Sequence, residues 1–105
     1  DVESRGLGDV YKRQEDICYL LQVCRHKLET NNYDELETEI RKANDLNGQL
    51  SHLKREELQR IQSQSGSIKV SMVYLTMIQE AQNVVTYTIN LMKVSRKFQV
   101  EKEEL

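Results

Sequence analysis

Apolar residues recur with a helical period in three separate stretches of the chain. In the first stretch, from about Gln14 to Thr30, they fall at i, i+3, i+4, i+7 and i+11, which is one face of an α-helix. The second stretch runs from about Asp34 to Ser63, and the third from about Ser67 to Glu101. The pattern therefore predicts three helices joined by two short connections.

Each predicted helix carries an apolar stripe along one face. The first stripe consists of Ile17, Leu20, Leu21, Cys24 and Leu28. The second consists of Leu36, Ile40, Ala43, Leu46, Leu50, Leu53, Leu58 and Ile61. The third has a main set of Val70, Val73, Tyr74, Met77, Ile78, Ala81, Val84, Val85, Thr88, Met92 and Ser95, widened by Leu75, Ile89, Leu91, Val94 and Phe98. A stripe wider than about 100° contacts more than one neighbour.

Residues between the stretches favour turns. Asn31 and Asn32 tolerate the left-handed conformation that ends a helix. Asp34, with Glu37 three residues later, predicts a capping box at the start of the second helix. Gly66 breaks the pattern before the third helix. We predict an all-α fold, an antiparallel up-down-up three-helix bundle with long helices.

Composition narrows the possible functions. The 105 residues include no proline, which favours long helices, and the formal net charge is −2 with both signs interspersed. This balance argues against a nucleic-acid partner. No apolar run reaches the roughly 18 residues of a membrane span. Cys18 and Cys24, six residues apart on a helix, are predicted to be reduced thiols because they lie too far apart for a disulfide.

The first thirteen residues do not share the helical pattern. They hold two of the four glycines, and the string SRGLGDVYKRQ resembles a translated sequencing adapter. We interpret residues 1–13 as a non-native or disordered N-terminal segment, and residues 14–105 as the helical domain.

Candidate catalytic groups are sparse. His52 and Glu56 stand at i, i+4, a spacing that can hold a metal, but without a third ligand they predict a solvated pair. His26 lies between two basic residues, which disfavours a metal there. No serine or cysteine has a base and an orienting acid at an interpretable spacing. The expectation is a non-enzymatic protein with no small-molecule substrate in this domain.

Polar residues interrupt the middle of the third helix. Glu80 is surrounded by amides and valines, whereas a metal site in a helical bundle needs several converging carboxylates. Glu80 is therefore only a weak metal candidate, and no cofactor is expected. We predict instead a structural or interface polar layer made of Asn47, Gln79, Glu80 and Asn83.

The segment from Leu46 to Phe98 resembles the PhoU-like helical domain. More narrowly, it resembles the cytoplasmic C-terminal domain of bacterial sodium/phosphate cotransporters, especially the Bacteroidetes type. The resemblance rests on LSHLKREELQRIQSQSGSIKVSMVYLTMIQEAQNVV, the ending KVSRKFQ, and NNYDELE between the first two helices. It covers about residues 14–105, and its motifs are moderately specific, since helical bundles share such patterns.

The resemblance bears directly on metal binding. PhoU proteins carry an acidic E-R-I-G-D-H signature for iron or zinc on the equivalent helix. Here Glu80 matches the glutamate, but Val84 and Val85 stand where the family has aspartate and histidine. On the second helix, the acidic or amide position falls on Asn47, beside Asp45. The family's metal is therefore not expected in this chain.

The resemblance implies a non-catalytic regulatory or interaction domain of a sodium-dependent phosphate transporter-like protein. Such a domain lies on the cytoplasmic side of the bacterial inner membrane. Two alternatives remain open: a metal-binding PhoU-type regulator of phosphate signalling, and a generic helical scaffold. Expected partners are a second copy, giving a homodimer, or the transporter's own membrane domain. The expected interface comprises part of the set Leu75, Ile89, Leu91, Val94 and Phe98, in the distal half of the third helix.

Deleting Asp1 to Arg13 should leave the melting temperature almost unchanged, because this segment lacks a periodic apolar face. Thermal unfolding followed by circular dichroism, with the full chain as reference, measures the effect. A fall of several degrees would show that the segment belongs to the folded domain.

Overall fold

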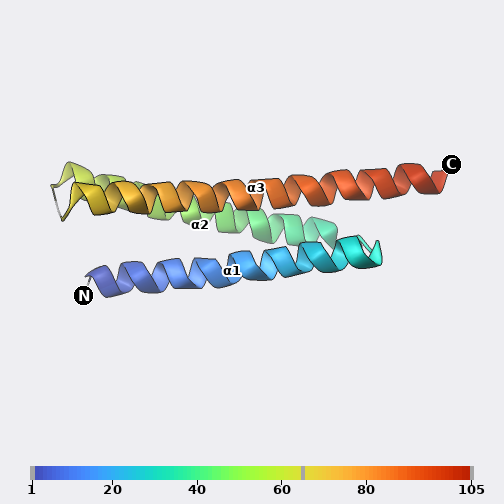
Figure 1. Cartoon of the computed structure of the whole chain (residues 1–105), viewed down its shortest axis with the longest axis horizontal. Helices are drawn as coiled ribbons and strands as arrows, with labels where there is room; N and C mark the ends of the chain where they lie inside the picture. Colours follow the sequence, from blue (N-terminus) through green and yellow to red (C-terminus); the bar gives the residue numbers. More distant parts are fainter. Residues whose placement is uncertain (1, 65, 105) are drawn as a thin grey trace.

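The computed structural model of the chain contains three α-helices: α1 (Val2–Thr30), α2 (Leu36–Gln62) and α3 (Ile68–Glu104). It describes the backbone of residues 2–64 and 66–104, and the side chains of residues 8, 9, 11–64 and 66–103. The helices run up, down and up to form a rod of 60 × 19 × 18 Å (Figure 1). No strand occurs in the described residues. The predicted all-α three-helix bundle is confirmed.

The first helix begins much earlier than the apolar pattern predicted. We expected it to start at about Gln14, but the backbone is helical from Val2 onward. Glycines at positions 6 and 8 each cost a helix about 1 kcal/mol, which weakens it without forbidding it, and no proline interrupts the segment. The assignment of residues 1–13 to a non-native segment stays a prediction, because helical backbone does not test it.

The predicted helix boundaries at Asn31 and Gly66 are confirmed, but the predicted capping box at the start of α2 is not. Asn31 and Gly66 both have positive φ, at 52° and 78°, as expected of residues that end or separate helices. The capping box on Asp34 is wrong. The residue preceding α2 is Glu35, which is itself left-handed (φ 62°) and makes no capping hydrogen bond through its side chain.

Two other side chains stabilise the turn between α1 and α2. The Asn32 side chain accepts a hydrogen bond from the Asp34 backbone N–H at 2.9 Å, which is an Asx turn. Lys27 is buried, and its Nζ donates to the Asp34 carbonyl oxygen at 2.7 Å. The aliphatic part of Lys27 thus occupies an inward position of α1, while its ammonium group ties α1 to the turn.

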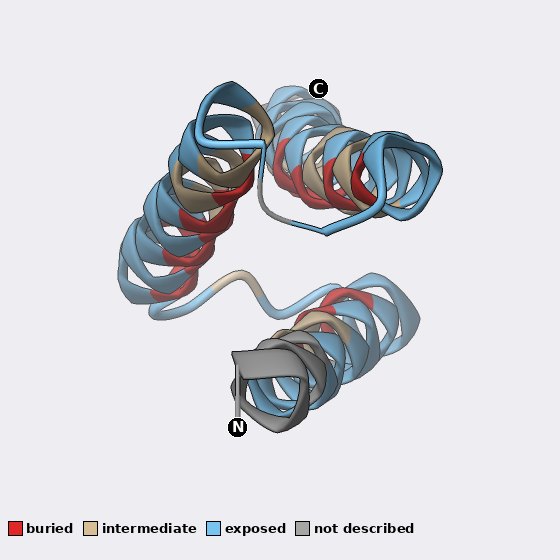
Figure 2. Ribbon diagram, turned by 90° about the vertical axis from the view of Figure 1, so that its left-hand side faces the viewer, coloured by how far each residue is buried: buried red, intermediate tan, exposed pale blue. Residues whose placement is uncertain are grey.

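The inward faces of all three helices meet in one apolar core (Figure 2). The second helix contributes the largest share of it, and the predicted α2 stripe is buried from Leu36 to Leu53. Beyond Leu53 the prediction fails. Leu58 is 44 % exposed, and Glu57 is buried in its place. The next inward position after Leu53 lies four residues on, so the helix geometry turns Glu57 inward and Leu58 toward solvent.

Glu57 is buried with partners for its charge. Ser71 Oγ donates to one carboxylate oxygen at 2.5 Å, and Arg60 Nη1 donates to the other at 3.0 Å. These bonds join the last turns of α2 to the first turn of α3 and offset the cost of burying the carboxylate. Burial, and secondarily the Glu57 charge, raise the pKa of the nearby Tyr74.

A paired substitution measures how strongly the core depends on α3. Met92 is fully buried, whereas Met72, on the same helix, is 58 % exposed. Met92→Ala should lower the free energy of unfolding by about 2–5 kcal/mol, because it removes buried apolar contacts and leaves a cavity. Met72→Ala is the matched control and should change it by no more than about 0.5 kcal/mol. Urea unfolding gives both values, and equal effects would contradict the described orientation of α3.

Candidate functional site

The outer side of α3 carries a continuous line of exposed residues, which are apolar at every position but one. Its members alternate at spacings of three and four residues, the 3.5-residue period of a coiled-coil contact line. We call this line the α3 seam: Val70, Val73, Met77, Glu80, Val84, Tyr87, Leu91, Val94 and Phe98. Exposed apolar faces of this kind are common at the interaction sites of proteins.

The inner side of α3 has a seven-residue repeat of its own. Ser71, Ile78, Val85 and Met92 follow one another at seven-residue intervals, and all four are buried. Figure 2 shows this buried side of α3 turned toward the other two helices and its exposed side turned away from them. The helix is thus apolar on two separate faces. One face makes the core of this bundle, and the other has no covering residues within the described chain.

The structure redefines the interface predicted in the distal half of α3. Leu91, Val94 and Phe98 are exposed by 50 %, 65 % and 68 % and belong to the seam. Leu75 is half-buried on the inner side. Ile89 is only 6 % exposed, so it belongs to the core, and its assignment to an outer interface is wrong. The reason is angular, because Ile89 lies one turn from Val85 and Met92 on the buried side.

The seam also reaches further than predicted. The main apolar set included Val70, Val73, Met77 and Val84 as inward residues, but all four are exposed. They extend the exposed face to the first turn of α3. The line is visible in the sequence as a strict alternation of three- and four-residue spacings. The buried residues Ser71, Ile78, Val85 and Met92 also repeat every seven positions, so this spacing alone does not show which line is exposed.

A network of polar side chains lies along one edge of the contact between α2 and α3. Asn47 Nδ2 donates to Thr86 Oγ1 at 3.3 Å. Gln82 Nε2 donates to Ser51 Oγ at 2.8 Å and to the Asn47 carbonyl oxygen at 3.2 Å. We use the name polar layer for this network together with the hydrogen bonds among Lys54, Gln79 and Asn83. It satisfies several polar groups that would otherwise cost free energy at a packed surface, while Asn47 Oδ1 is buried without a hydrogen-bond partner among the described residues.

The polar layer continues toward the loop between the helices. Lys54 Nζ donates to Gln79 Oε1 at 2.7 Å, and Gln79 Nε2 donates to Asn83 Oδ1 at 3.1 Å. The structure therefore brings together three predicted members of the layer, Asn47, Gln79 and Asn83. Glu80 is not one of them, because it is exposed and lies on the α3 seam.

Sequence reasoning missed four members of the layer: Ser51, Lys54, Gln82 and Thr86. Their hydrogen bonds show how the two helices are aligned. Each step forward along α2 is matched by an equal step backward along α3. The Arg96–Glu37 pair, with 2.7 Å between Arg96 Nη1 and Glu37 Oε1, follows the same alignment near the far end of the bundle. The hydrogen bond from Arg96 lowers the pKa of Glu37. Polar contacts thus specify the register of α2 on α3.

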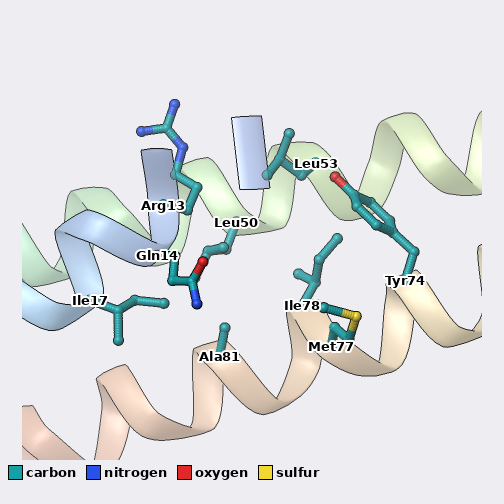
Figure 3. Close-up of a pocket in the computed structure, with 9 residues that line it drawn as sticks. All are labelled: Arg13, Gln14, Ile17, Leu50, Leu53, Tyr74, Met77, Ile78 and Ala81. Atoms are coloured by element: carbon teal, nitrogen blue, oxygen red, sulfur yellow. The ribbon is translucent and has the colours of Figure 1, made fainter. Parts of the chain in front are cut away.

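An apolar cavity of about 180 Å³ lies where the three helices meet (Figure 3). Arg13, Gln14 and Ile17 of α1 line one side, Leu50 and Leu53 of α2 a second, and Tyr74, Met77, Ile78 and Ala81 of α3 the third. None of these side chains is a nucleophile paired with a base. The cavity could admit a small apolar molecule, as apolar cavities of similar volume do.

The other candidate groups are scattered. His52 Nε2 and Glu56 Oε1 lie 2.8 Å apart on an exposed face, which confirms the predicted pair. They line an open polar groove between α1 and α2 of about 620 Å³. Within the described side chains, no three His, Cys, Asp or Glu residues lie close enough together to hold a metal ion.

Both cysteines are free thiols, as predicted. Cys18 is exposed, and Cys24 is buried in the core. Burial raises the pKa of Cys24, so this thiol is a packing group rather than a nucleophile.

The polar layer should contribute measurably to stability. Gln82→Ala removes both hydrogen bonds to α2 and should lower the free energy of unfolding by about 1–3 kcal/mol. Asn90→Ala, at an exposed position of the same helix, is the control and should leave stability unchanged or slightly higher, because alanine favours helix. Urea titration of both variants tests this. Equal stabilities would show that the layer contributes nothing.

None of the three helices, over the residues described, has the length and apolar character needed to cross a bilayer. Comparisons with protein-family models, with curated proteins and with solved structures found no match to this chain.

Proposed function

We propose that this chain is a non-catalytic interaction domain that docks through the α3 seam. The observation that carries the proposal is the line of eight exposed apolar residues and one glutamate along more than 40 Å of a single helix, at about 1.5 Å per residue. Isolated exposed apolar residues are common on protein surfaces, but a long contiguous line with coiled-coil spacing is what partner helices bind.

The resemblance to PhoU-like domains suggests where such a domain works. We propose that it regulates a sodium-dependent phosphate transporter-like protein from the cytoplasmic side of the bacterial inner membrane. The order of a charged helix, a glycine-containing loop and the YLTMIQE segment supports this assignment. In this proposal the seam contacts either a second copy of the domain or the transporter's membrane domain.

The site chemistry supports binding rather than catalysis. The polar residues in the middle of α3, of which only Glu80 matches the family's metal-binding signature, have two other roles. Gln79, Gln82 and Asn83 hydrogen-bond within the bundle. Glu80 is exposed on the outer seam, and it belongs to no group of three or more His, Cys, Asp or Glu residues within the described side chains. Neither arrangement activates a water molecule or positions a nucleophile.

The test begins with the intact gene. The reading frame upstream of Gln14 should encode membrane spans, and the full-length protein in membrane vesicles should take up phosphate in a sodium-dependent manner. The variant Leu91→Glu with Phe98→Glu places two charges on the seam and should change the uptake rate, because an unpaired charge in a buried interface is costly.

Val100→Glu is the matched control, since Val100 is an exposed apolar residue of α3 that lies off the seam. It should leave uptake unchanged. An upstream frame without membrane spans would overturn the transporter assignment. Equal uptake by the seam variant, the control and the wild-type protein would overturn the docking role.

A further inference from the structure

The α3 seam has a distribution of charge that identifies its partner. Glu80 is the only acidic residue of α3 before Glu101, and it lies in the first half of the helix. The second half contains the basic residues Lys93, Arg96 and Lys97. Arg96 is already paired with Glu37 of α2, whereas Lys97 is exposed immediately beside the seam residue Phe98.

From this arrangement we propose that the seam binds the same seam of a second copy, antiparallel, with Glu80 of each chain beside Lys97 of the other. The inference rests on the proposed function only in taking the seam as the docking face. It goes further by naming the occupant, its direction and the charge pair that aligns it.

The spacing of the seam residues requires that the binding partner be a helix. Residues that repeat every 3.5 positions remain in line only against another helix that winds around the first, as in a coiled coil. A strand or an extended peptide would lose register with the seam after one or two turns. Within the described chain, α3 itself offers a second seam of matching length and period.

The direction follows from the placement of Glu80. In a parallel, in-register pair, Glu80 would face its own copy, and two carboxylates would be buried against each other. Like charges at such a position destabilise the pair. An antiparallel pair instead sets Glu80 against the basic cluster of the partner, which consists of Lys93, Arg96 and Lys97. Seating Glu80 beside the partner's Lys97 brings Tyr87 of each chain against Leu91 of the other, close to the two-fold axis.

The arrangement is self-complementary. A two-fold axis generates two identical Glu80–Lys97 pairs, and the apolar seam residues between Glu80 and Phe98 of the two chains cover one another. The first helix widens the surface. It runs parallel to α3, and its exposed Leu21 and Leu28 follow Ile17, which lines the same cavity as Ala81 of α3. Two helices from each chain thus supply apolar side chains to the contact.

Exchanging the charges of Glu80 and Lys97 tests whether the partner is a second copy and whether the two α3 helices are antiparallel. Sedimentation equilibrium should show the wild-type chain as a dimer. Glu80→Lys and Lys97→Glu, made singly, should each weaken dimerisation by about tenfold or more, because each sets like charges together. The double variant restores opposite charges in the antiparallel pair and should dimerise about as tightly as the wild type. Both positions are exposed, so circular dichroism should show unchanged helix content.

The alternative outcomes separate the possibilities. In a parallel pair, residue 80 meets residue 80 and residue 97 meets residue 97, so a double variant that stays as weak as the single ones overturns the antiparallel arrangement. A wild-type chain that is monomeric at several hundred micromolar overturns the second copy as occupant. If uptake by the full-length protein still responds to the Leu91 and Phe98 substitutions in that case, the docking role of the seam stands.

Discussion

The packing of α2 against α3 is the interaction on which the rest of the structure depends. The apolar stripe of α2 supplies the largest share of the core, and the core is complete only when the buried residues of α3 pack against it. Apolar burial alone would allow the two helices to shift by one turn relative to each other. Leucine, isoleucine and methionine side chains can pack against one another in more than one alignment. The polar layer removes that freedom, since Gln82 can reach both Ser51 and Asn47 in one alignment.

The fixed alignment decides which side of α3 faces solvent. With Val85 and Met92 held in the core, the seam residues remain exposed, although Met77 also lines the cavity between the three helices. The exposed face is therefore a consequence of how α2 and α3 are joined. A rotation of α3 by about 100°, the angle between successive residues, would bury Val84 and Leu91 and expose Ile89, which would remove both the core contact and the seam.

Much of the fold follows from residues that act locally. Helical periodicity predicts all three helices, and Asn31 and Gly66 mark the turns because each adopts a positive φ. The candidate site was less predictable. The third stripe is apolar around most of the helix, so periodicity could not distinguish the inward Ile89 from the outward Leu91. The same difficulty placed Leu58 in the core, where Glu57 lies, because a buried carboxylate becomes acceptable only with Ser71 and Arg60 beside it. Those partners come from tertiary contacts that no local pattern specifies.

The open edge between α1 and α2 has a consequence for how the molecule opens. Two grooves lie between these helices, and one of them is lined by Asp9, Asn44, Asp45 and His52, whose polar side chains add little cohesion. The hairpin of α2 and α3 has the most extensive packing between helices, and it carries the cross-helix hydrogen bonds. It therefore forms a cooperative unit from which α1 can detach first. Backbone amides of α1 would then exchange with deuterated solvent by a partial opening, while those in the middle of α2 and α3 exchange only when the whole bundle unfolds.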